Sequence, residues 1–485
     1  MSEIRNLEPK AVWDIFQQLC DIPRPSKKEQ KAAEFAKEFG EKLGLETVVD
    51  EIGNVIIKKP ATKGLEDCKT VVLQGHVDMV PQKNSGIDHD FEKDPIKAYV
   101  DGEWVTAKDT TLGADNGIGV AASLAVLQAN DIEHGPLEVL LTIDEETGMT
   151  GAENLKAGYL DADIMINTDS EDEGELYIGC AGGVDTNAKF YFNEESVPAD
   201  SVAYIIDVKG LKGGHSGMDI PLGRGNSNKI LNRFLYKLNK SLDIRLADIQ
   251  SGSLRNAIPR EGFAIVTVPT AQVGEFKTFI DELIPQIKSE LTVTEPDMEV
   301  TYGETEMPAK VIDEKTHNNL VKALYGFPNG VIRMSDAMEG LVETSTNLAV
   351  VKKQEGFIEI GSLQRSSVES AKEDLANMIR SVLELAGAEV VHEGAYPGWN
   401  PNINSPILKT MQDVYNNKWG KVPEIKAIHA GLECGIIMEN YPNLDTISFG
   451  PTIRYPHSPD EKVNIKTVGM FYDFLKETLK NIPKK

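Results

Sequence analysis

The sequence has few cysteines and no recognisable export signal. Its four cysteines are scattered without a Cys-x-x-Cys pair, and the opening segment "MSEIRNLEPK" shows no basic stretch followed by an apolar one. Few, unpaired cysteines and the lack of an export signal are typical of proteins that work in a reducing compartment. These absences predict a cytoplasmic protein.

Long apolar runs and an excess of basic residues are also missing. The runs "VVL" (71–73) and "LEVLLTI" (137–143) are far shorter than the roughly 20 residues of a membrane helix. Lys and Arg number 50 against 76 Asp and Glu, so the formal charge is -26. A surface of that sign repels phosphate backbones and anionic lipids. We therefore expect a soluble protein with neither nucleic acid nor membrane as its partner.

The chain of 485 residues is longer than a domain with a single hydrophobic core usually is, so two or three domains are expected. Strand-like and helical segments alternate up to about residue 186, as in an α/β domain with a mainly parallel sheet. Longer alternating strands and helices then indicate an α+β segment with two similar halves. The α/β pattern returns near the end. We predict a catalytic domain formed by 1–186 and 396–485, with an inserted lid domain at 187–395.

Several apolar strands of the α/β domain end in polar side chains. The segment "LLTIDEETG" (140–148) leaves an apolar stretch for three adjacent carboxylates, whose repulsion costs stability unless a cation lies among them. Other such endings are "VVLQGHVD", "IMINTDS" and "ISFGPTIRYPHS". Ligands bind where the carboxyl ends of parallel strands meet. We expect this edge to collect the following side chains: His76, Asp78, Glu145, Glu146, Asp169 and His457.

Imidazoles and carboxylates gathered at one edge are the ligands of zinc or a similar divalent ion. With Asp115 of "TTLGADNGIG" added, the set is too large for one tetrahedral site. It suits two ions about 3.5–4 Å apart that share a carboxylate. The sequence thus predicts a two-metal centre whose cations offset the repulsion.

Each residue also has a structural explanation. The carboxylates after 143 could form a solvated turn, Asp115 a helix N-cap, Asp169 a turn residue and His457 a surface-loop histidine. His76 and Asp78 are two apart on a predicted strand and could simply share a hydrogen bond. The joint pattern favours the metal centre.

Six motifs point to one family. The segments "GHVDMVP", "GADNGIG", "DEETGMTGA", "NTDSEDEG", "GGHSGMDI" and "PHSPDE" occur in this order over most of the chain. In this the sequence resembles the dinuclear zinc peptidases that include glutamate carboxypeptidases, aminoacylases and carnosinases, and most of all their aminoacyl-histidine dipeptidase branch.

The resemblance implies a role for each candidate. His76 and Asp169 would hold one Zn2+, Glu146 and His457 the other, and Asp115 both, with Co2+ or Mn2+ as substitutes. Asp78 would orient His76, and Glu145 would act as the general base. In the inserted lid, substrate contacts would come from His215, Asn256 and Arg365, and His215 would also act in catalysis by stabilising the oxyanion. A glycine turn at "KGGHSG" and ordinary strand-end polar groups are the structural alternatives for these three.

The predicted reaction is amide hydrolysis of short peptides with a free C-terminal carboxylate, and the branch implies Xaa-His dipeptides. An N-acyl amino acid amidohydrolase, a two-metal phosphodiesterase and a non-catalytic metal-binding protein are the alternatives. The pattern is compatible with a homodimer. If the strand continues through Glu145 and Glu146, these neighbours point to opposite sides and have different roles, one as base and one as ligand.

Overall fold

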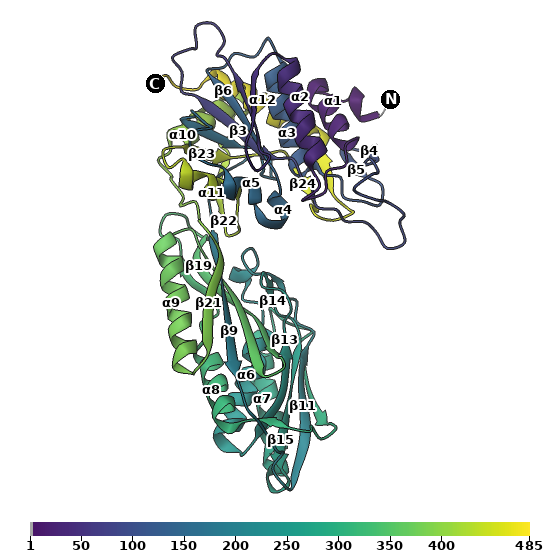
Figure 1. Cartoon of the computed structure of the whole chain (residues 1–485), viewed down its shortest axis with the longest axis vertical. Coiled ribbons are helices and arrows are strands. Elements are labelled where there is room, and N and C mark those ends of the chain that lie inside the picture. Colours follow the sequence, from purple (N-terminus) through teal and green to yellow (C-terminus); the bar gives the residue numbers. More distant parts are fainter. Residues whose placement is uncertain (1–2) are drawn as a thin grey trace. The chain divides into compact units, whose positions relative to one another are not determined.

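The protein, described here by a computed structural model of residues 3–485, divides into two compact units that we describe separately (Figure 1). Unit 1 contains the described residues up to Cys180 together with Pro401–Ala427 and Leu432–Lys485, and unit 2 contains Ala181–Asn400 and Ile428–Gly431. Unit 2 thus begins before the expected residue 187, because β9 (Gly182–Tyr191) pairs with strands of unit 2 from its first residue. The segment 428–431 was not anticipated from the sequence.

Unit 1 is built on an eight-stranded mixed sheet. Its order is β1 (Glu46–Val49), β2 (Val55–Lys59), β6 (Leu137–Thr142), β3 (Val71–His76), β7 (Ile164–Asn167), β23 (Asp445–Ser448), β8 (Glu175–Cys180) and β22 (Glu424–Ile428). The four central strands β6, β3, β7 and β23 are parallel, whereas β1, β2 and β8 pair antiparallel with their neighbours. The expectation of a mainly parallel sheet is therefore correct for the centre only. A short turn joins β1 to β2, which allows only antiparallel pairing there.

Helices cover this sheet, and α3 (Ala114–Gln128) is the most deeply buried of them. Every residue from Ala114 to Leu127 is buried, and six of these fourteen are glycine or alanine, which lets neighbouring elements approach closely. The other helices of the unit are α1 (Lys10–Cys20), α2 (Gln30–Lys42), α10 (Pro406–Trp419), α11 (Glu433–Asn440) and α12 (Ile465–Lys480), with the short turns η1 (Glu3–Asn6), α4 (Glu145–Gly148) and α5 (Thr150–Asn154). Among residues 3–485, no helix combines the length and apolar character required to cross a membrane.

A smaller antiparallel sheet joins distant parts of unit 1. Its order is β24 (Ile453–Arg454), β25 (Lys462–Asn464), β5 (Trp104–Ala107) and β4 (Ala98–Asp101). The loop that carries His457 lies between β24 and β25, so this sheet anchors the loop at both ends.

The largest sheet of unit 2 is formed by two halves of the same topology. The main order is β16 (Glu299–Glu304), β11 (Ser201–Lys209), β15 (Gly262–Pro269), β13 (Arg245–Ser251), β19 (Val342–Lys353), β20 (Phe357–Ser366), β9 and β21 (Glu389–Tyr396). Each half is a βαββαβ unit, and its second strand in sequence, β13 or β19, meets the other half. The two similar halves predicted from the sequence are therefore present.

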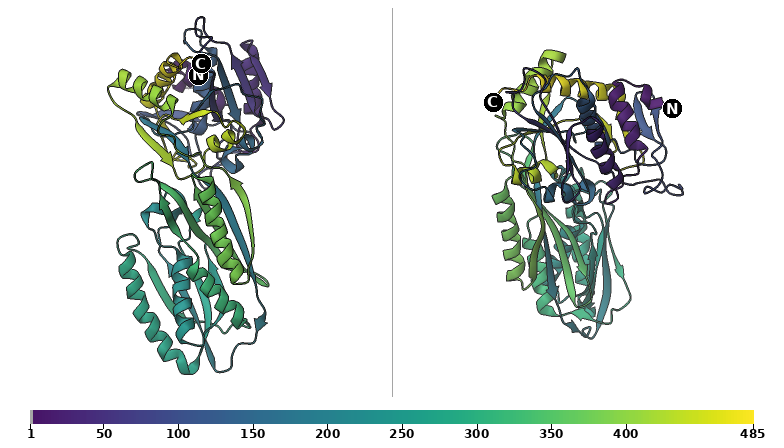
Figure 2. Two further views of the ribbon diagram at one scale, coloured as in Figure 1. Left: turned by 90° about the vertical axis from the view of Figure 1, so that its left-hand side faces the viewer. Right: turned by 45° about the horizontal axis from the view of Figure 1, so that its top comes forward.

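The helices of unit 2 pack on one face of this sheet (Figure 2). They are α6 (Ser227–Ser241), α7 (Val273–Leu291), α8 (Glu314–Gly326) and α9 (Glu369–Leu385), and they share one apolar core with the strands. Along β11, Tyr204, Ile206 and Val208 are buried, whereas the residues between them are partly exposed. Alternation of this kind is typical of a sheet with one covered face. The minor elements are β10 (Glu194–Glu195), β12 (Gly214–His215), β14 (Ala257–Ile258), β17 (Val311–Ile312), β18 (Gly330–Met334), η2 (Ile220–Leu222) and η3 (Thr270–Gln272).

Candidate metal centre

The polar residues that end the central strands of unit 1 lie at one edge of the sheet. His76 is the last residue of β3, and Asp169 follows the end of β7. Glu145 and Glu146 open α4, just after β6. Parallel strands end at a common edge, so the strand order accounts for this grouping.

His76 occupies the centre of the group. Its imidazole is 1% exposed, with Nδ1 3.2 Å from Asp78 Oδ1. On the other side of the ring, Nε2 lies 3.2 Å from Asp115 Oδ1 and also 3.2 Å from Asp169 Oδ1. One ring nitrogen therefore faces two carboxylates from different elements.

His457 forms a second group with the other oxygen of Asp115. Its Nε2 lies 3.1 Å from Asp115 Oδ2 and 3.0 Å from Glu146 Oε2. Asp115 thus presents one oxygen to each histidine. The backbone at Asp115, the second residue of α3, departs from helical geometry, with φ -79° and ψ 113°, so this residue is not part of a regular helical turn.

The charges of these groups affect one another strongly. Burial favours a neutral His76, but the neighbouring Asp169 and Asp115 hold its pKa well above the usual value. Burial likewise favours a neutral His457, yet Asp115 and Glu146 raise its pKa to about 11. Burial, followed by repulsion from Asp115, raises the pKa of Glu146. The carboxylates outnumber the imidazoles, so added positive charge would stabilise the group.

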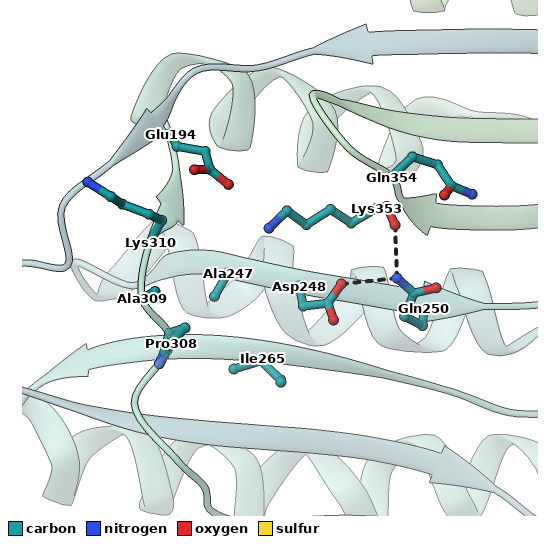
Figure 3. A pocket seen from close by; sticks show the side chains of 10 residues that line it. All are labelled: Glu194, Ala247, Asp248, Gln250, Ile265, Pro308, Ala309, Lys310, Lys353 and Gln354. Carbon is teal, nitrogen blue, oxygen red and sulfur yellow. Dashed lines mark hydrogen bonds between the residues drawn. The ribbon is translucent and has the colours of Figure 1, made fainter.

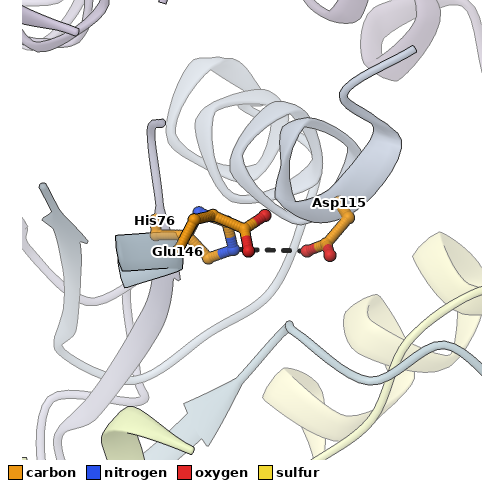
Figure 4. Close-up of side chains that lie close together, drawn as sticks. All are labelled: His76, Asp115 and Glu146. Carbon is orange, nitrogen blue, oxygen red and sulfur yellow. Dashed lines mark hydrogen bonds and ion pairs between the residues drawn. The ribbon is translucent and has the colours of Figure 1, made fainter. Parts of the chain in front are cut away.

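The donor set fits a divalent cation. His76, Asp115 and Glu146 each offer a ligand atom, and these atoms all lie within 4.8 Å of one another (Figure 4). Within the described residues, the buried atoms His76 Nδ1, Asp169 Oδ1 and Glu146 Oε1 make no hydrogen bond of good geometry. Imidazole nitrogen and carboxylate oxygen are ligands that zinc, manganese and cobalt accept.

Glu145 lies beside this group but belongs to neither histidine pair. Burial, then repulsion from Asp169, Glu146 and Glu433, raises its pKa well above the usual value, although His76 opposes the shift. The strand does not continue through Glu145, so the condition for opposite sides of a strand is not met: Asp144 adopts a left-handed conformation with φ 50° and precedes α4. The two glutamates still diverge, since successive residues of a helix point in different directions.

Sequence reasoning missed a buried glutamate close to the centre. Glu433 is 1% exposed, and its Oε2 accepts hydrogen bonds of 2.6 Å from both Gln74 Nε2 and Thr142 Oγ1. Burial raises the pKa of Glu433 to about 7. Its position at the start of α11 carried no sequence signal, because its side-chain partners lie on β3 and β6.

The other three candidates belong to unit 2. His215 lies on β12 and Arg365 on β20, and Arg365 Nη2 is 3.4 Å from His215 Nε2. The exposed Asn256 is close to them, since its carbonyl accepts a hydrogen bond of 2.8 Å from the backbone N–H of Ser216. Arg365 also donates to Tyr396 Oη at 2.9 Å. Burial, then the charge of Arg365, lowers the pKa of His215 to about 4, so its imidazole is neutral at pH 7.

Unit 2 also contains an open pocket of about 480 Å³ (Figure 3). Lys353 extends into it between Glu194 and Asp248, and Gln250 Nε2 donates to Asp248 Oδ1 at 3.2 Å. None of its ten lining residues is a candidate for the metal centre or for substrate binding. This pocket is therefore not part of the site predicted from the sequence.

Comparison with known proteins gives the family of the chain. The chain is 47% identical to the cytosol non-specific dipeptidase of Escherichia coli over 485 residues, which covers 100% of both chains. The crystal structure of aminoacylhistidine dipeptidase from Vibrio alginolyticus superposes with a TM-score of 0.94 at 50% identity, covering 100% of this chain and 99% of that one. Aminopeptidase PepT from Bacillus cereus shares the fold, with a TM-score of 0.62 at 17% identity over 98% of this chain and 99% of that one. The model of peptidase family M20/M25/M40 matches residues 72–481, and the chain belongs to this family.

Proposed function

We propose that this chain is a metal-dependent dipeptidase that hydrolyses short peptides with a free C-terminal carboxylate, Xaa-His dipeptides among them. The observation that carries the proposal is the Asp115 carboxylate, whose two oxygens face two histidines, each with a carboxylate of its own. The names of the two full-length relatives support the same class of substrate.

The proposed cofactor is a pair of Zn2+ ions, with Co2+ or Mn2+ as substitutes. His76 and Asp169 would hold one ion, Glu146 and His457 the other, and Asp115 both. When bound, such ions lower the pKa of water toward about 7 and polarise the scissile carbonyl. The pairwise contacts of about 3 Å among these five side chains support the assignment.

Glu145 is the proposed general base. A carboxylate with a raised pKa can take a proton from the attacking water and give it to the departing amine. Asp78 would keep both His76 and the start of α4 in place, since its carboxylate is close to the ring and accepts the backbone N–H groups of Glu145 and Glu146.

The groups of unit 2 are proposed to bind the substrate. The guanidinium of Arg365 suits the terminal carboxylate of a dipeptide, because such pairs form charge-assisted hydrogen bonds. A neutral His215 can donate one N–H to the oxyanion that develops during attack, and Asn256 can bind a peptide amide. In this proposal the inserted unit serves as the lid that selects short substrates.

A substrate panel tests the proposed function. Purified protein would be assayed with Xaa-His and other dipeptides, tripeptides, dipeptide amides and N-acetyl amino acids, first with a chelator and then after return of Zn2+, Mn2+ or Co2+. We expect dipeptides to be cleaved fastest and the chelator to abolish cleavage reversibly. Faster release of acetate with inert dipeptides would favour the N-acyl amino acid amidohydrolase. No cleavage by metal-loaded protein would favour the non-catalytic binding protein.

Two further expectations stay predictions. The name of the Escherichia coli relative supports a cytosolic location. A homodimer could place His215 in the partner's site, so His215→Ala and Glu145→Ala chains should be mixed. Recovered activity in the mixture would show that the histidine acts across subunits, and its absence would place His215 in the site of its own chain.

A further inference from the structure

The turn 112–115 carries Asp115 into the metal centre, and a buried carboxylate binds its backbone. Glu461 is 2% exposed and accepts four N–H groups from this turn. Its Oε2 lies 2.8 Å from the nitrogen of Leu112 and 2.9 Å from that of Gly113. Its Oε1 lies 2.8 Å from the nitrogen of Ala114 and 3.2 Å from that of Asp115. Both oxygens of this carboxylate thus accept two hydrogen bonds each, and all four come from one turn.

A buried arginine holds the same turn from the carbonyl side. Arg24 is 2% exposed, and its Nη2 donates to the carbonyl of Gly113 at 2.5 Å. Its Nη1 donates to the carbonyls of Val77 at 3.0 Å and Asp78 at 2.9 Å. One guanidinium therefore links the segment that follows His76 to the turn that carries Asp115.

Gly113 is the point where the two side chains meet the backbone. It has φ +71°, and a Cβ at this position would lie 2.6 Å from Arg24 Nη2 and 2.8 Å from Met79 Sδ. Its N–H binds Glu461 and its C=O binds Arg24. No direct ion pair joins Arg24 to Glu461 in the described part of the chain. The two buried charges are therefore separated by the peptide groups that they hold.

The cost of burying these charges suggests a purpose beyond stability. Replacing a buried charge pair with apolar side chains is often neutral or stabilising, so such groups are weak evidence for stabilisation of a fold. Here both side chains act on the segment that must keep Asp115 between His76 and His457. Glu461 also follows His457 by four residues, so it links that histidine's loop to the same turn.

We propose that Arg24 and Glu461 are a pair of positioning residues that fix Asp115 between the two histidines and thereby set the affinity of both metal positions. The inference rests on the proposed function only for the presence of the metal pair. It assigns neither side chain to metal binding or to contact with substrate.

The test variant is Glu461→Gln. The amide keeps the size of the side chain but replaces one acceptor oxygen with a donor, which would face backbone N–H groups. Titration of Zn2+ against a chromophoric chelator would measure both dissociation constants. We expect both to rise by about 10–100-fold, as is typical when a partner that orients metal ligands is lost. A substitution at Glu146, by contrast, should weaken one position.

Glu138→Gln is the matched control. Glu138 is also 2% exposed, accepts the backbone N–H of Asp161 at 3.0 Å and lies 3.0 Å from Lys58 Nζ. It occupies the second position of β6, whereas the metal centre is at the other end of that strand. Its loss should lower Tm without changing the two Zn2+ constants.

Arg24→Lys gives a second test if Glu461→Gln fails to fold. A single ammonium cannot reproduce the planar fork that reaches three carbonyls, so both Zn2+ constants should again rise. Zn2+ constants equal to those of the wild type in the variants that fold, with Tm lowered as in Glu138→Gln, would overturn the inference. A wild-type chain that binds two ions but cleaves no dipeptide would refute the proposed function and leave this inference intact. A wild-type chain that binds no divalent ion would overturn this inference about Arg24 and Glu461.

Discussion

Asp78 binds Glu145 through the backbone N–H of that residue. Asp78 Oδ1 accepts the N–H of Glu145 at 3.0 Å, and Oδ2 accepts the N–H of Glu146 at 3.2 Å and the hydroxyl of Ser26 at 2.8 Å. The same Oδ1 lies 3.2 Å from His76 Nδ1. One buried carboxylate therefore positions a proposed metal ligand and the proposed base together.

Asp78→Asn should disturb both of these residues. An asparagine has one acceptor oxygen, so its amide group would face either the imidazole or the start of α4 with the wrong polarity. We expect kcat to fall by about 10–100-fold and Zn2+ affinity to fall by a similar factor. Steady-state kinetics and a chelator titration check this. Unchanged Zn2+ affinity with normal kcat would show that Asp78 has no such role.

Glu145→Gln should separate metal binding from catalysis. No proposed ligand is lost, so the variant should keep two metal ions per chain. Turnover should fall by about 10²–10⁴-fold because general-base transfer is removed. Elemental analysis and the dipeptide assay on the same sample measure the two effects. Loss of metal from this variant would contradict the assignment of Glu145 as base.

Glu146→Gln should behave differently from its neighbour. Glu146 Oε2 lies 3.0 Å from His457 Nε2, and a neutral amide oxygen is a poorer zinc ligand than a carboxylate. We expect the variant to lose or weaken one ion and to regain some activity in excess Zn2+. If it instead kept two ions and was merely slow, the roles of the two glutamates would be exchanged.

Much of the centre follows from the pattern of strand endings. His76 ends the apolar strand β3 and Asp169 follows the apolar strand β7, and parallel neighbours end at the same edge. The sequence could not show that β6 stops at Thr142, because the left-handed turn at Asp144 depends on local contacts. Residue alternation, which applies only within a strand, therefore does not describe the two glutamates that follow.

The buried residues that hold the centre could not be predicted from the sequence, for a different reason. Arg24 and Glu461 bind backbone groups remote in the sequence, and a backbone partner leaves no residue pattern. Glu461 lies within the motif "PHSPDE", yet its position next to Asp115 depends on the sheet that anchors the His457 loop. The segment 428–431, at which the chain re-enters unit 2, likewise depends on tertiary contacts and has no signal in the sequence.

Arg365→Lys tests the proposed recognition of the substrate carboxylate. Lysine keeps the charge but loses the fork that contacts Tyr396 and Ser216, so KM for dipeptides should rise about tenfold, or about 1.4 kcal/mol. Dipeptide amides lack the carboxylate, and their kcat/KM should change little. Arg255→Lys is the control, because Arg255 pairs with Asp185 at 3.0 Å and is 58% exposed. Equal losses for dipeptides and their amides would exclude carboxylate recognition by Arg365.

The stability of unit 2 should depend on pH through His317. This α8 residue is 0% exposed, and burial, then the charge of Arg245, lowers its pKa to about 4. In the unfolded chain the pKa is about 6.5. The unfolded state thus binds a proton that the folded state does not, so stability is full above about pH 6.5 and falls as pH drops toward 4. The predicted loss is about 3 kcal/mol.

His317→Leu measures this contribution. Leucine cannot bind a proton and suits the apolar surroundings, since neither ring nitrogen of His317 has a hydrogen-bond partner among the described residues. Denaturant unfolding should therefore give the variant a smaller loss of stability between pH 7 and pH 4.5 than the wild type. His89→Leu is the control, because His89 lies in unit 1, outside the core of unit 2. An identical pH dependence in the wild type and His317→Leu would show that His317 is not the group that titrates.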